Sequence, residues 1–177
     1  MRLFIAINFN KQTKKKLLDV QEELRSAGAS GKFTLPENLH LTLVFLGECD
    51  SKQISLIKSI INSIEFKPFT IHMNHIGRFK RDDKDLWWVG VHGNAQLTKL
   101  HYDLADKLIS AGFKIEKRKF NPHITIGRKI VTKKEPCSIA SFNETITSIE
   151  LMKSEHVNGA LKYSIIHSLS VLEFNRL

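Results

Sequence analysis

Apolar and polar positions alternate along seven stretches of the chain and recur at helical spacing along three others. Alternation is typical of a β-strand with one buried face, whereas apolar residues three and four positions apart are typical of an amphipathic helix. The predicted strands are Arg2–Asn8, Leu39–Leu46, Phe69–Arg78, Leu86–Val91, His123–Ile130, Thr145–Lys153 and Leu161–Leu172. The predicted helices run from Asn10 to about Ser26, from Asp50 or Ser51 through Ile64, and from Asn94 to Gly112.

The order of these elements predicts the class of fold. Strands outnumber helices and the two do not alternate strictly, which favours an α+β fold. Two hairpins are expected, one joined by the charged loop Lys80–Asp85 and the other following the polar stretch Thr132–Asn143. No low-complexity or linker-like segment interrupts the chain, so we predict one domain over residues 1–177.

One short motif occurs twice, as His40-Leu41-Thr42-Leu43 and as His123-Ile124-Thr125-Ile126, each time within a predicted strand. Side chains of a strand alternate between its two faces, so the histidine and threonine of each copy share one face and the aliphatic residues point into a core. The repetition suggests two similar lobes, each of which contributes one motif strand to a shared groove.

The side chains of His40, Thr42, His123 and Thr125 suit the metal-free hydrolysis of a phosphodiester. One group must remove a proton from the attacking water and another must protonate the departing oxygen, and histidine populates both protonation states near neutrality. Threonine hydroxyls can donate hydrogen bonds to non-bridging phosphate oxygens. One copy alone would more often be an ordinary half-exposed strand histidine, but two copies favour function. Zinc is a weaker alternative because neither copy has further ligands at the usual spacing.

The charge balance favours a polyanionic partner. The chain has 27 lysine and arginine residues against 18 aspartate and glutamate residues, which gives a formal net charge of +9 at pH 7. Such an excess raises encounter rates with polyanions, although part of it, such as the run Lys14–Lys16, is expected to be a solvated helix face. The charge makes RNA or DNA a reasonable partner without choosing between them.

The sequence has no pattern typical of a disulfide framework, a membrane span or an export signal. The two cysteines, Cys49 and Cys137, have no paired or metal-ligand spacing, and the start MRLFIAINFNK lacks the anatomy of a signal peptide. No apolar run approaches the length that spans a bilayer. A cytoplasmic location without membrane association is therefore expected. No apolar helix stripe is surplus to one core, which favours a monomer.

Longer segments around both motifs resemble known signatures. The segment Pro36–Glu48, PENLHLTLVFLGE, is similar to the first signature of the RNA 2′,3′-cyclic phosphodiesterases, a family of the two-histidine phosphoesterase superfamily that includes bacterial and archaeal 2′–5′ RNA ligase-like proteins. The segment Pro122–Arg128, PHITIGR, resembles their second signature. Weaker likenesses are the opening RLFIAI, the LWWVGV stretch from Leu86, and Leu151–Tyr163, so the resemblance covers nearly the whole chain.

This resemblance implies a bilobal α+β fold in which two antiparallel-sheet lobes with outer helices surround a central groove lined by both motifs. It implies hydrolysis of RNA 2′,3′-cyclic phosphate ends to 2′-phosphomonoesters, with His40 as the acid that protonates the 3′-oxygen and His123 as the base that activates water. Chemistry alone leaves these two roles exchangeable. No metal or cofactor is expected. Some relatives also join RNA halves through a 2′–5′ linkage, which makes tRNA fragments one candidate class of substrate.

Two further positions test the logic of strand alternation. Arg128 and Phe45 each lie five residues after a motif histidine, so regular alternation places both on the core face. Because a buried arginine charge is costly, we expect a bulge or bend at Gly127 that returns Arg128 to the groove, where the resemblance implies contact with the phosphate or the nucleotide. For Phe45 we expect burial in the core, with stacking on a nucleobase as the alternative.

Two other functions are compatible with the same residues. A two-histidine phosphodiesterase could act on 2′–5′ oligonucleotides or small cyclic nucleotides, and its turnover would then depend weakly on salt. A non-catalytic RNA-binding module could use the histidines only to contact phosphate. The two intact motifs argue against this second alternative, because binding alone does not need two groups that titrate near neutrality.

Overall fold

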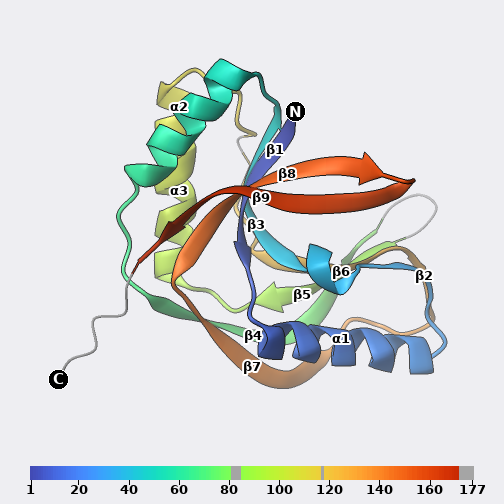
Figure 1. Cartoon of the computed structure of the whole chain (residues 1–177). Helices are drawn as coiled ribbons and strands as arrows, with labels where there is room; N and C mark the ends of the chain where they lie inside the picture. Colours follow the sequence, from blue (N-terminus) through green and yellow to red (C-terminus); the bar gives the residue numbers. More distant parts are fainter. Residues whose placement is uncertain (81–84, 117, 172–177) are drawn as a thin grey trace.

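The computed structural model describes residues 1–80, 85–116 and 118–171 (Figure 1). The elements, in chain order, are β1 (Arg2–Asn8), α1 (Lys11–Ser26), β2 (Ser30–Phe33), the short 3₁₀ turn η1 (Pro36–Asn38), β3 (His40–Glu48), α2 (Ser51–Asn62), β4 (Phe69–Phe79), β5 (Asp85–Val91), α3 (Ala95–Ser110), β6 (His123–Val131), β7 (Ser138–Ile146), β8 (Ser148–Val157) and β9 (Ala160–Ser170). No helix among these residues is long and apolar enough to cross a membrane.

The three α-helices begin where local capping chemistry predicts. The side chains of Asn10, Asp50 and Asn94 each accept a hydrogen bond, 2.8 Å long, from the backbone N–H three residues later. Such bonds satisfy one of the donors that a helix leaves unpaired at its start. At α2 the side chain of Gln53 also accepts from the backbone N–H of Asp50, which completes a capping box.

The described strands form one curled antiparallel sheet with the order β7-β4-β5-β6-β3-β1-β8-β9, and β2 pairs with β6 outside this path. The halves β3-β1-β8-β9 and β6-β5-β4-β7 meet where Leu41 pairs with Ile124, the single register pair between β3 and β6. The two predicted sheet lobes are therefore the halves of one continuous sheet, and each motif strand lies at the junction. The predicted α+β fold is confirmed.

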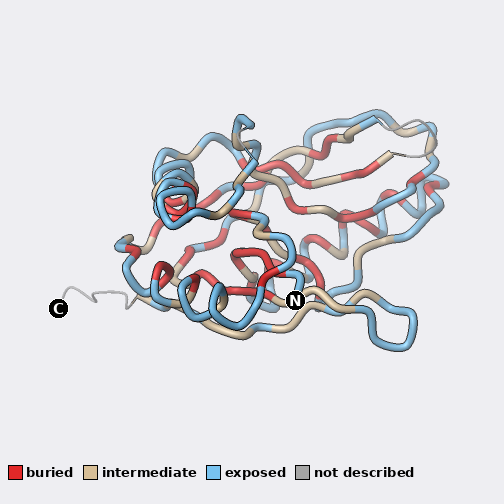
Figure 2. Tube along the Cα trace, turned by 90° about the horizontal axis from the view of Figure 1, so that it is seen from above, coloured by how far each residue is buried: buried red, intermediate tan, exposed pale blue. Residues whose placement is uncertain are grey.

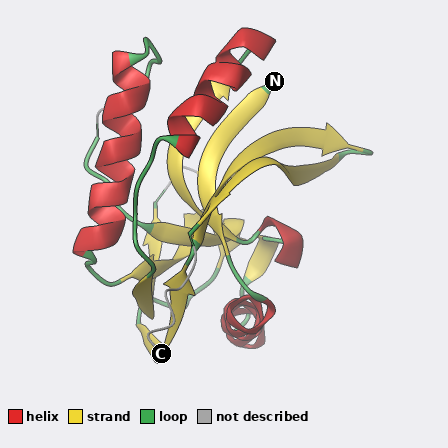
Figure 3. Cartoon of the chain, turned by 60° about the vertical axis from the view of Figure 1, so that its left-hand side comes forward, coloured by secondary structure: helices red, strands yellow, loops and turns green. Residues whose placement is uncertain are grey.

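Helices cover the sheet from outside. Helices α2 and α3 lie side by side, α1 lies apart from them, and the β8–β9 hairpin projects away from the body (Figures 1 and 3). Buried positions follow the strands and the inward faces of the helices (Figure 2). In β1, for example, Leu3, Ile5 and Ile7 are buried in the main core. The aliphatic residues of both motifs join this core, as alternation predicts.

The predicted strand Thr145–Lys153 is wrong as a single element, because β7 ends at Ile146 and β8 begins at Ser148. The first part of β7 lies in the stretch Thr132–Asn143 that the sequence pattern predicts to be loop. Strand β7 is an edge strand with largely exposed, polar residues, so it lacks the apolar alternation of a half-buried strand. The short strand β2 was missed for the same reason.

The remaining strand predictions hold within the described residues. The β4–β5 and β8–β9 hairpins pair as expected. Residues 81–84 of the charged loop and Leu172 of the last predicted strand lie outside the described residues.

Candidate active site

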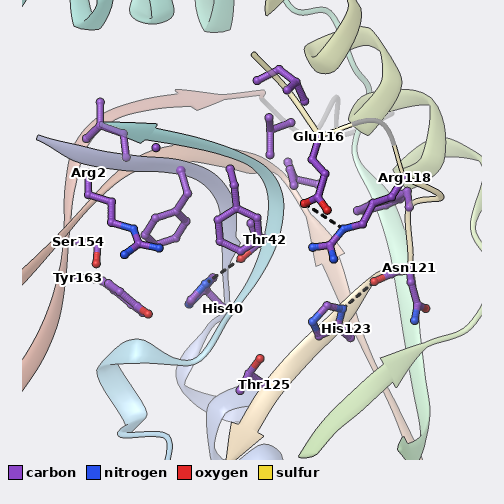
Figure 4. Close-up of a pocket in the computed structure, with 18 of the residues that line it drawn as sticks. Arg2, His40, Thr42, Glu116, Arg118, Asn121, His123, Thr125, Ser154 and Tyr163 are labelled. Atoms are coloured by element: carbon purple, nitrogen blue, oxygen red, sulfur yellow. Dashed lines mark hydrogen bonds and ion pairs between the residues drawn. The ribbon is translucent and has the colours of Figure 1, made fainter. Parts of the chain in front are cut away.

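The motif strands β3 and β6 line one groove between the two halves of the sheet (Figure 4). This groove has a volume of about 950 Å³. The register of the β3–β6 pair sets each motif histidine across from the threonine of the other strand. The structure thus brings together every side chain that the sequence nominated for the site: His40, Thr42, Phe45, His123, Thr125 and Arg128 all line the groove.

The two histidines are held in the same way. Nδ1 of His40 donates to the backbone carbonyl of Asn38, and Nδ1 of His123 donates to that of Asn121, both over 2.7 Å. A carbonyl oxygen can only accept a hydrogen bond, so Nδ1 carries the proton on each neutral ring. Nε2 of each ring is then the atom left to exchange a proton with a ligand (Figure 4).

The threonine of each motif faces the same groove as its histidine. The hydroxyl of Thr42 is 3.0 Å from Nε2 of His40 and donates to it when the ring is neutral. Thr125 occupies the corresponding place on β6 and lines the groove beside His123 (Figure 4). Each motif therefore presents one titratable nitrogen and one hydroxyl to the same space.

A β-bulge in β3 determines the position of Phe45. In the β1–β3 register Ile5 pairs with Val44 and Ala6 with Thr42, which leaves Leu43 as an extra residue. Leu43 and Val44 are consequently both buried, and the side-chain alternation is reversed after them. Phe45 is 56% exposed and faces the groove. The expectation that Phe45 lies in the core is therefore wrong.

The same irregularity occurs in β6 and exposes Arg128. Trp87 and Trp88 of β5 pair with Gly127 and Thr125, so Ile126 is the extra residue. This bulge lies one residue before the predicted position at Gly127, and it turns Arg128 out of the core. The two bulges follow their histidines at equal distance, so the local geometry of the two motif strands is repeated.

A helix side chain donates a hydrogen bond to the carbonyl of each bulged residue. Nδ1 of His101 on α3 donates to the carbonyl of Leu43 over 2.8 Å. Nε2 of Gln21 on α1 donates to the carbonyl of Ile126, also over 2.8 Å, and to that of Thr34. Helix α1 follows β1 in one half of the sheet and anchors β6 in the other half. Helix α3 follows β5 and anchors β3 in the opposite sense. These bonds link the two halves of the sheet at the bulged residues, which determine the directions of Phe45 and Arg128.

Replacing Gln21 with methionine is expected to lower the free energy of unfolding by about 1–3 kcal/mol, because the buried carbonyl of Ile126 and the half-buried carbonyl of Thr34 each lose a donor. The same change is expected to weaken turnover by loosening the bulge that aims Arg128. Urea unfolding and steady-state kinetics measure the two effects. The matched control is Gln12→Met, an exposed glutamine on the same helix, which should change neither. If Gln21→Met and Gln12→Met had the same free energy of unfolding and the same turnover, the anchoring role of Gln21 would be contradicted.

Burial sets the protonation of both histidines. It lowers the pKa of His40 from its ordinary value of 6.5 to about 4, although the hydrogen bond to Asn38 partly opposes this effect. Burial also lowers the pKa of His123, and the positive charges of Arg118 and Arg128 lower it further. Both rings are therefore neutral near pH 7, and an anion bound between them would raise both pKa values.

An aromatic ring stands edge-on against each histidine. Tyr163 meets His40 with ring centroids 5.1 Å apart and an interplanar angle of 87°. Phe79 meets His123 at 5.1 Å and 86°. The ring centroid of Phe4 lies 4.9 Å from that of His40 and 5.0 Å from that of Tyr163. These apolar walls supply the burial that lowers the two pKa values and limit the rotation of each imidazole.

Alternation around the two motifs alone did not point to several other polar residues of the groove. They are Arg2, Glu48, Glu116, Arg118, Lys119, Asn121, Ser154, Glu155, His156 and Tyr163. A signal was available for some of them, because Arg2 shares the groove face with Phe4 by simple alternation along β1. No group of three or more His, Cys, Asp or Glu side chains within the described part of the chain is arranged to hold a metal ion.

Comparisons with known proteins agree with this fold and site. Residues 7–88 and 89–161 both match the family described as "LigT like Phosphoesterase". Proteins named RNA 2′,3′-cyclic phosphodiesterase match at 33% identity in Archaeoglobus fulgidus, over 94% of this chain and 92% of the relative. In Thermotoga maritima the identity is 40%, over 72% of this chain and 70% of the relative.

A solved structure shares the fold. The crystal structure of Escherichia coli LigT complexed with 3′-AMP superposes with a TM-score of 0.85 at 23% identity, covering 96% of this chain and 97% of that one. The curled antiparallel sheet, with both copies of the histidine–threonine motif in one groove, agrees with the phosphoesterase family that residues 7–88 and 89–161 match. The chain belongs to the LigT-like phosphoesterase family, and the protein is an enzyme.

Proposed function

We propose that this enzyme hydrolyses RNA 2′,3′-cyclic phosphate ends to 2′-phosphomonoesters with His40 and His123 as its general acid and base. The observation that carries the proposal is the matched pair of imidazoles, each with Nδ1 held by a backbone carbonyl and Nε2 directed into one groove. The names of the Archaeoglobus and Thermotoga relatives support the choice of substrate.

The proposed step transfers two protons on opposite sides of the phosphorus. Neutral His123 takes a proton at Nε2 from water as the water oxygen bonds to phosphorus. The bond from phosphorus to the 3′-oxygen breaks, and protonated His40 delivers its Nε2 proton to that oxygen. The product retains the bond to the 2′-oxygen and is a 2′-phosphomonoester. Proton exchange with solvent then restores the starting states of the two rings.

Thr42, Thr125 and Arg128 are proposed to stabilise the charge on the non-bridging oxygens in this transition state. Two hydroxyls from opposite strands and one guanidinium line the same groove as the two histidines. Donors already in place for developing charge act most strongly in a partly desolvated site. Phe45, exposed on the same wall, is proposed to stack on a nucleobase.

The same groups can also transfer the cyclic phosphate to the 5′-hydroxyl of a second RNA end. If the 5′-hydroxyl of a second RNA end replaces water, His123 takes its proton and the attack forms a 2′–5′ phosphodiester as the 3′-oxygen leaves. We propose this ligation as a secondary activity, with tRNA fragments as one candidate pair of ends. A single bilobal domain over residues 1–177, a monomer without cofactor, and a cytoplasmic location stay part of the proposal.

The pH dependence should reflect the burial of both histidines. We expect kcat/KM, which reports the free enzyme, to peak below pH 6.5, because the pKa values of His40 and His123 are both lowered. Above this peak kcat/KM falls because His40 loses the proton that it must donate. In the enzyme–substrate complex the anionic phosphate raises both pKa values, so the kcat profile should lie at higher pH. A kcat/KM that is constant from pH 5 to 8 would contradict these assignments.

The test of the proposed function is the product formed from an RNA oligonucleotide that ends in a 2′,3′-cyclic phosphate, incubated in EDTA. Complete conversion to the 2′-phosphate, distinguished from the 3′ isomer by chromatography against standards, would support the proposal. Faster turnover of a 2′–5′ oligonucleotide or of a 3′,5′-cyclic nucleotide would identify the alternative phosphodiesterase. RNA binding without turnover of any phosphodiester would indicate a binding module.

A further inference from the structure

The proposed roles of the two histidines determine on which side of the groove the RNA lies. In an in-line displacement, the attacking water and the departing 3′-oxygen occupy opposite sides of the phosphorus. The 3′-oxygen belongs to the terminal ribose and receives its proton from His40. The ribose and every nucleotide before it must therefore extend over the half of the sheet that carries His40, and water must approach from the half that carries His123.

Three polar side chains form a row on the half that carries His40. In the sheet register Arg2 of β1 pairs with Ser154 of β8, and Ser154 pairs with Tyr163 of β9. All three line the groove, and Figure 4 shows Arg2 extending toward Tyr163. Burial raises the pKa of the Tyr163 hydroxyl, and the positive charges of Arg128 and Arg2 partly oppose this effect. The row thus runs from Tyr163, whose ring contacts His40, through Ser154 to Arg2.

The charge of Arg2 is available to a ligand. Arg2 forms no ion pair with any residue in the described ranges, and Glu48, its partner across the β1–β3 ladder, pairs instead with the amino group of Met1 at 3.0 Å. On the other side of the groove, Arg118 pairs with Glu116 at 3.3 Å. Arg2 therefore supplies positive charge on the side of His40, where the in-line geometry puts the phosphate that precedes the terminal nucleotide.

The length of β1 leaves room for one nucleotide between a cyclic phosphate at the histidines and a second phosphate near Arg2. Ala6 pairs with Thr42, and Arg2 lies four residues before Ala6 in β1, so these two backbone positions are about 13 Å apart. The exposed ring of Phe45 lies within this interval, opposite Phe4. One nucleoside can occupy this length, with its cyclic phosphate at the histidines and its 5′-phosphate near Arg2.

We propose that Arg2, Ser154 and Tyr163 form a subsite for the phosphodiester that joins the terminal nucleotide to the preceding one. This inference rests on the proposed function and specifies that the preferred RNA substrate has at least two nucleotides. The guanidinium supplies the charge, and the two hydroxyls donate hydrogen bonds to the same phosphate. Such a subsite binds any base sequence, because it contacts only the backbone.

The test compares kcat/KM for adenosine 2′,3′-cyclic phosphate with that for the dinucleotide ApA ending in a 2′,3′-cyclic phosphate. We expect the wild type to prefer the dinucleotide by about tenfold, the value of one charge-assisted hydrogen bond. Arg2→Gln should remove most of this preference. Lys52→Gln, which makes the same charge change on the exposed face of α2, should leave it unchanged. A dinucleotide with a neutral methylphosphonate linkage should be turned over like the mononucleotide by the wild type.

The outcomes separate the subsite from the proposed function. Equal turnover of mononucleotide and dinucleotide by the wild type would overturn the subsite and leave the proposed function intact. A preference that survives both Arg2→Gln and the methylphosphonate substitution would show that the second nucleoside, and not its phosphate, is bound. Failure to turn over either cyclic phosphate would overturn the proposed function and with it the subsite.

Discussion

His123→Ala and His40→Ala are each expected to lower kcat for an RNA 2′,3′-cyclic phosphate by about 10²–10⁴-fold, the usual contribution of a well-placed proton transfer. Both Nε2 atoms face the same groove, and neither variant removes a group from the main core. The change should therefore appear mainly in kcat, while the free energy of unfolding falls by only about 1–3 kcal/mol, because the carbonyl of Asn38 or Asn121 loses its donor. Single-turnover kinetics together with urea unfolding would measure the two quantities.

A change of leaving group distinguishes the acid from the base. Bis(p-nitrophenyl) phosphate releases a weakly basic aryl oxide that needs little protonation. If the enzyme turns it over, His40→Ala should recover most of its activity on this ester, whereas His123→Ala should stay impaired because water still has to be activated. The opposite pattern would mean that the two histidines exchange roles. Full activity of both variants on the RNA substrate would refute the two-histidine mechanism.

Arg128→Met is expected to lower kcat/KM by about 10²-fold, because the variant loses the guanidinium that the β6 bulge directs into the groove. Charge developing on the non-bridging oxygens is greatest in the transition state, so kcat should fall more than KM rises. Arg128→Lys should recover part of the loss, since it restores the charge but not the planar pair of donors. Steady-state kinetics at several salt concentrations would measure these effects.

The matched control for Arg128 is Arg118→Met. Arg118 also lines the groove and carries the same charge, but it is exposed and paired with Glu116. Its removal is expected to change kcat/KM by only a few-fold, with a strong dependence on salt. If Arg128→Met and Arg118→Met lose kcat/KM equally, and high salt abolishes their difference from the wild type, Arg128 acts only through the overall electrostatic field of the groove.

Much of this architecture depends on interactions between residues that are near in sequence, and this part could be predicted from the chain. Asn10, Asp50 and Asn94 cap helices through bonds to the third residue after them, so the helix starts were correct. The two motifs stand out because alternation puts a histidine and a threonine on one face of each strand. Edge strand β7 could not be found in this way, because its neighbour β4 stabilises it and its own pattern is polar.

The sequence by itself determined the α+β class, the helix starts, and the two histidines and two threonines that face a groove, because each depends on local spacing and on residue type. The cost of burying a charge already predicted that Arg128 turns into the groove, although the structure places the bulge at Ile126 and not at Gly127. Only the tertiary structure decided the direction of Phe45, because the extra residue of the β3 bulge is visible only against the neighbouring strand β1. Only the tertiary structure brought Arg2, Ser154 and Tyr163 into one row, because strands far apart in sequence pair side by side. Such pairing depends on the packing of the whole sheet, which no local pattern encodes.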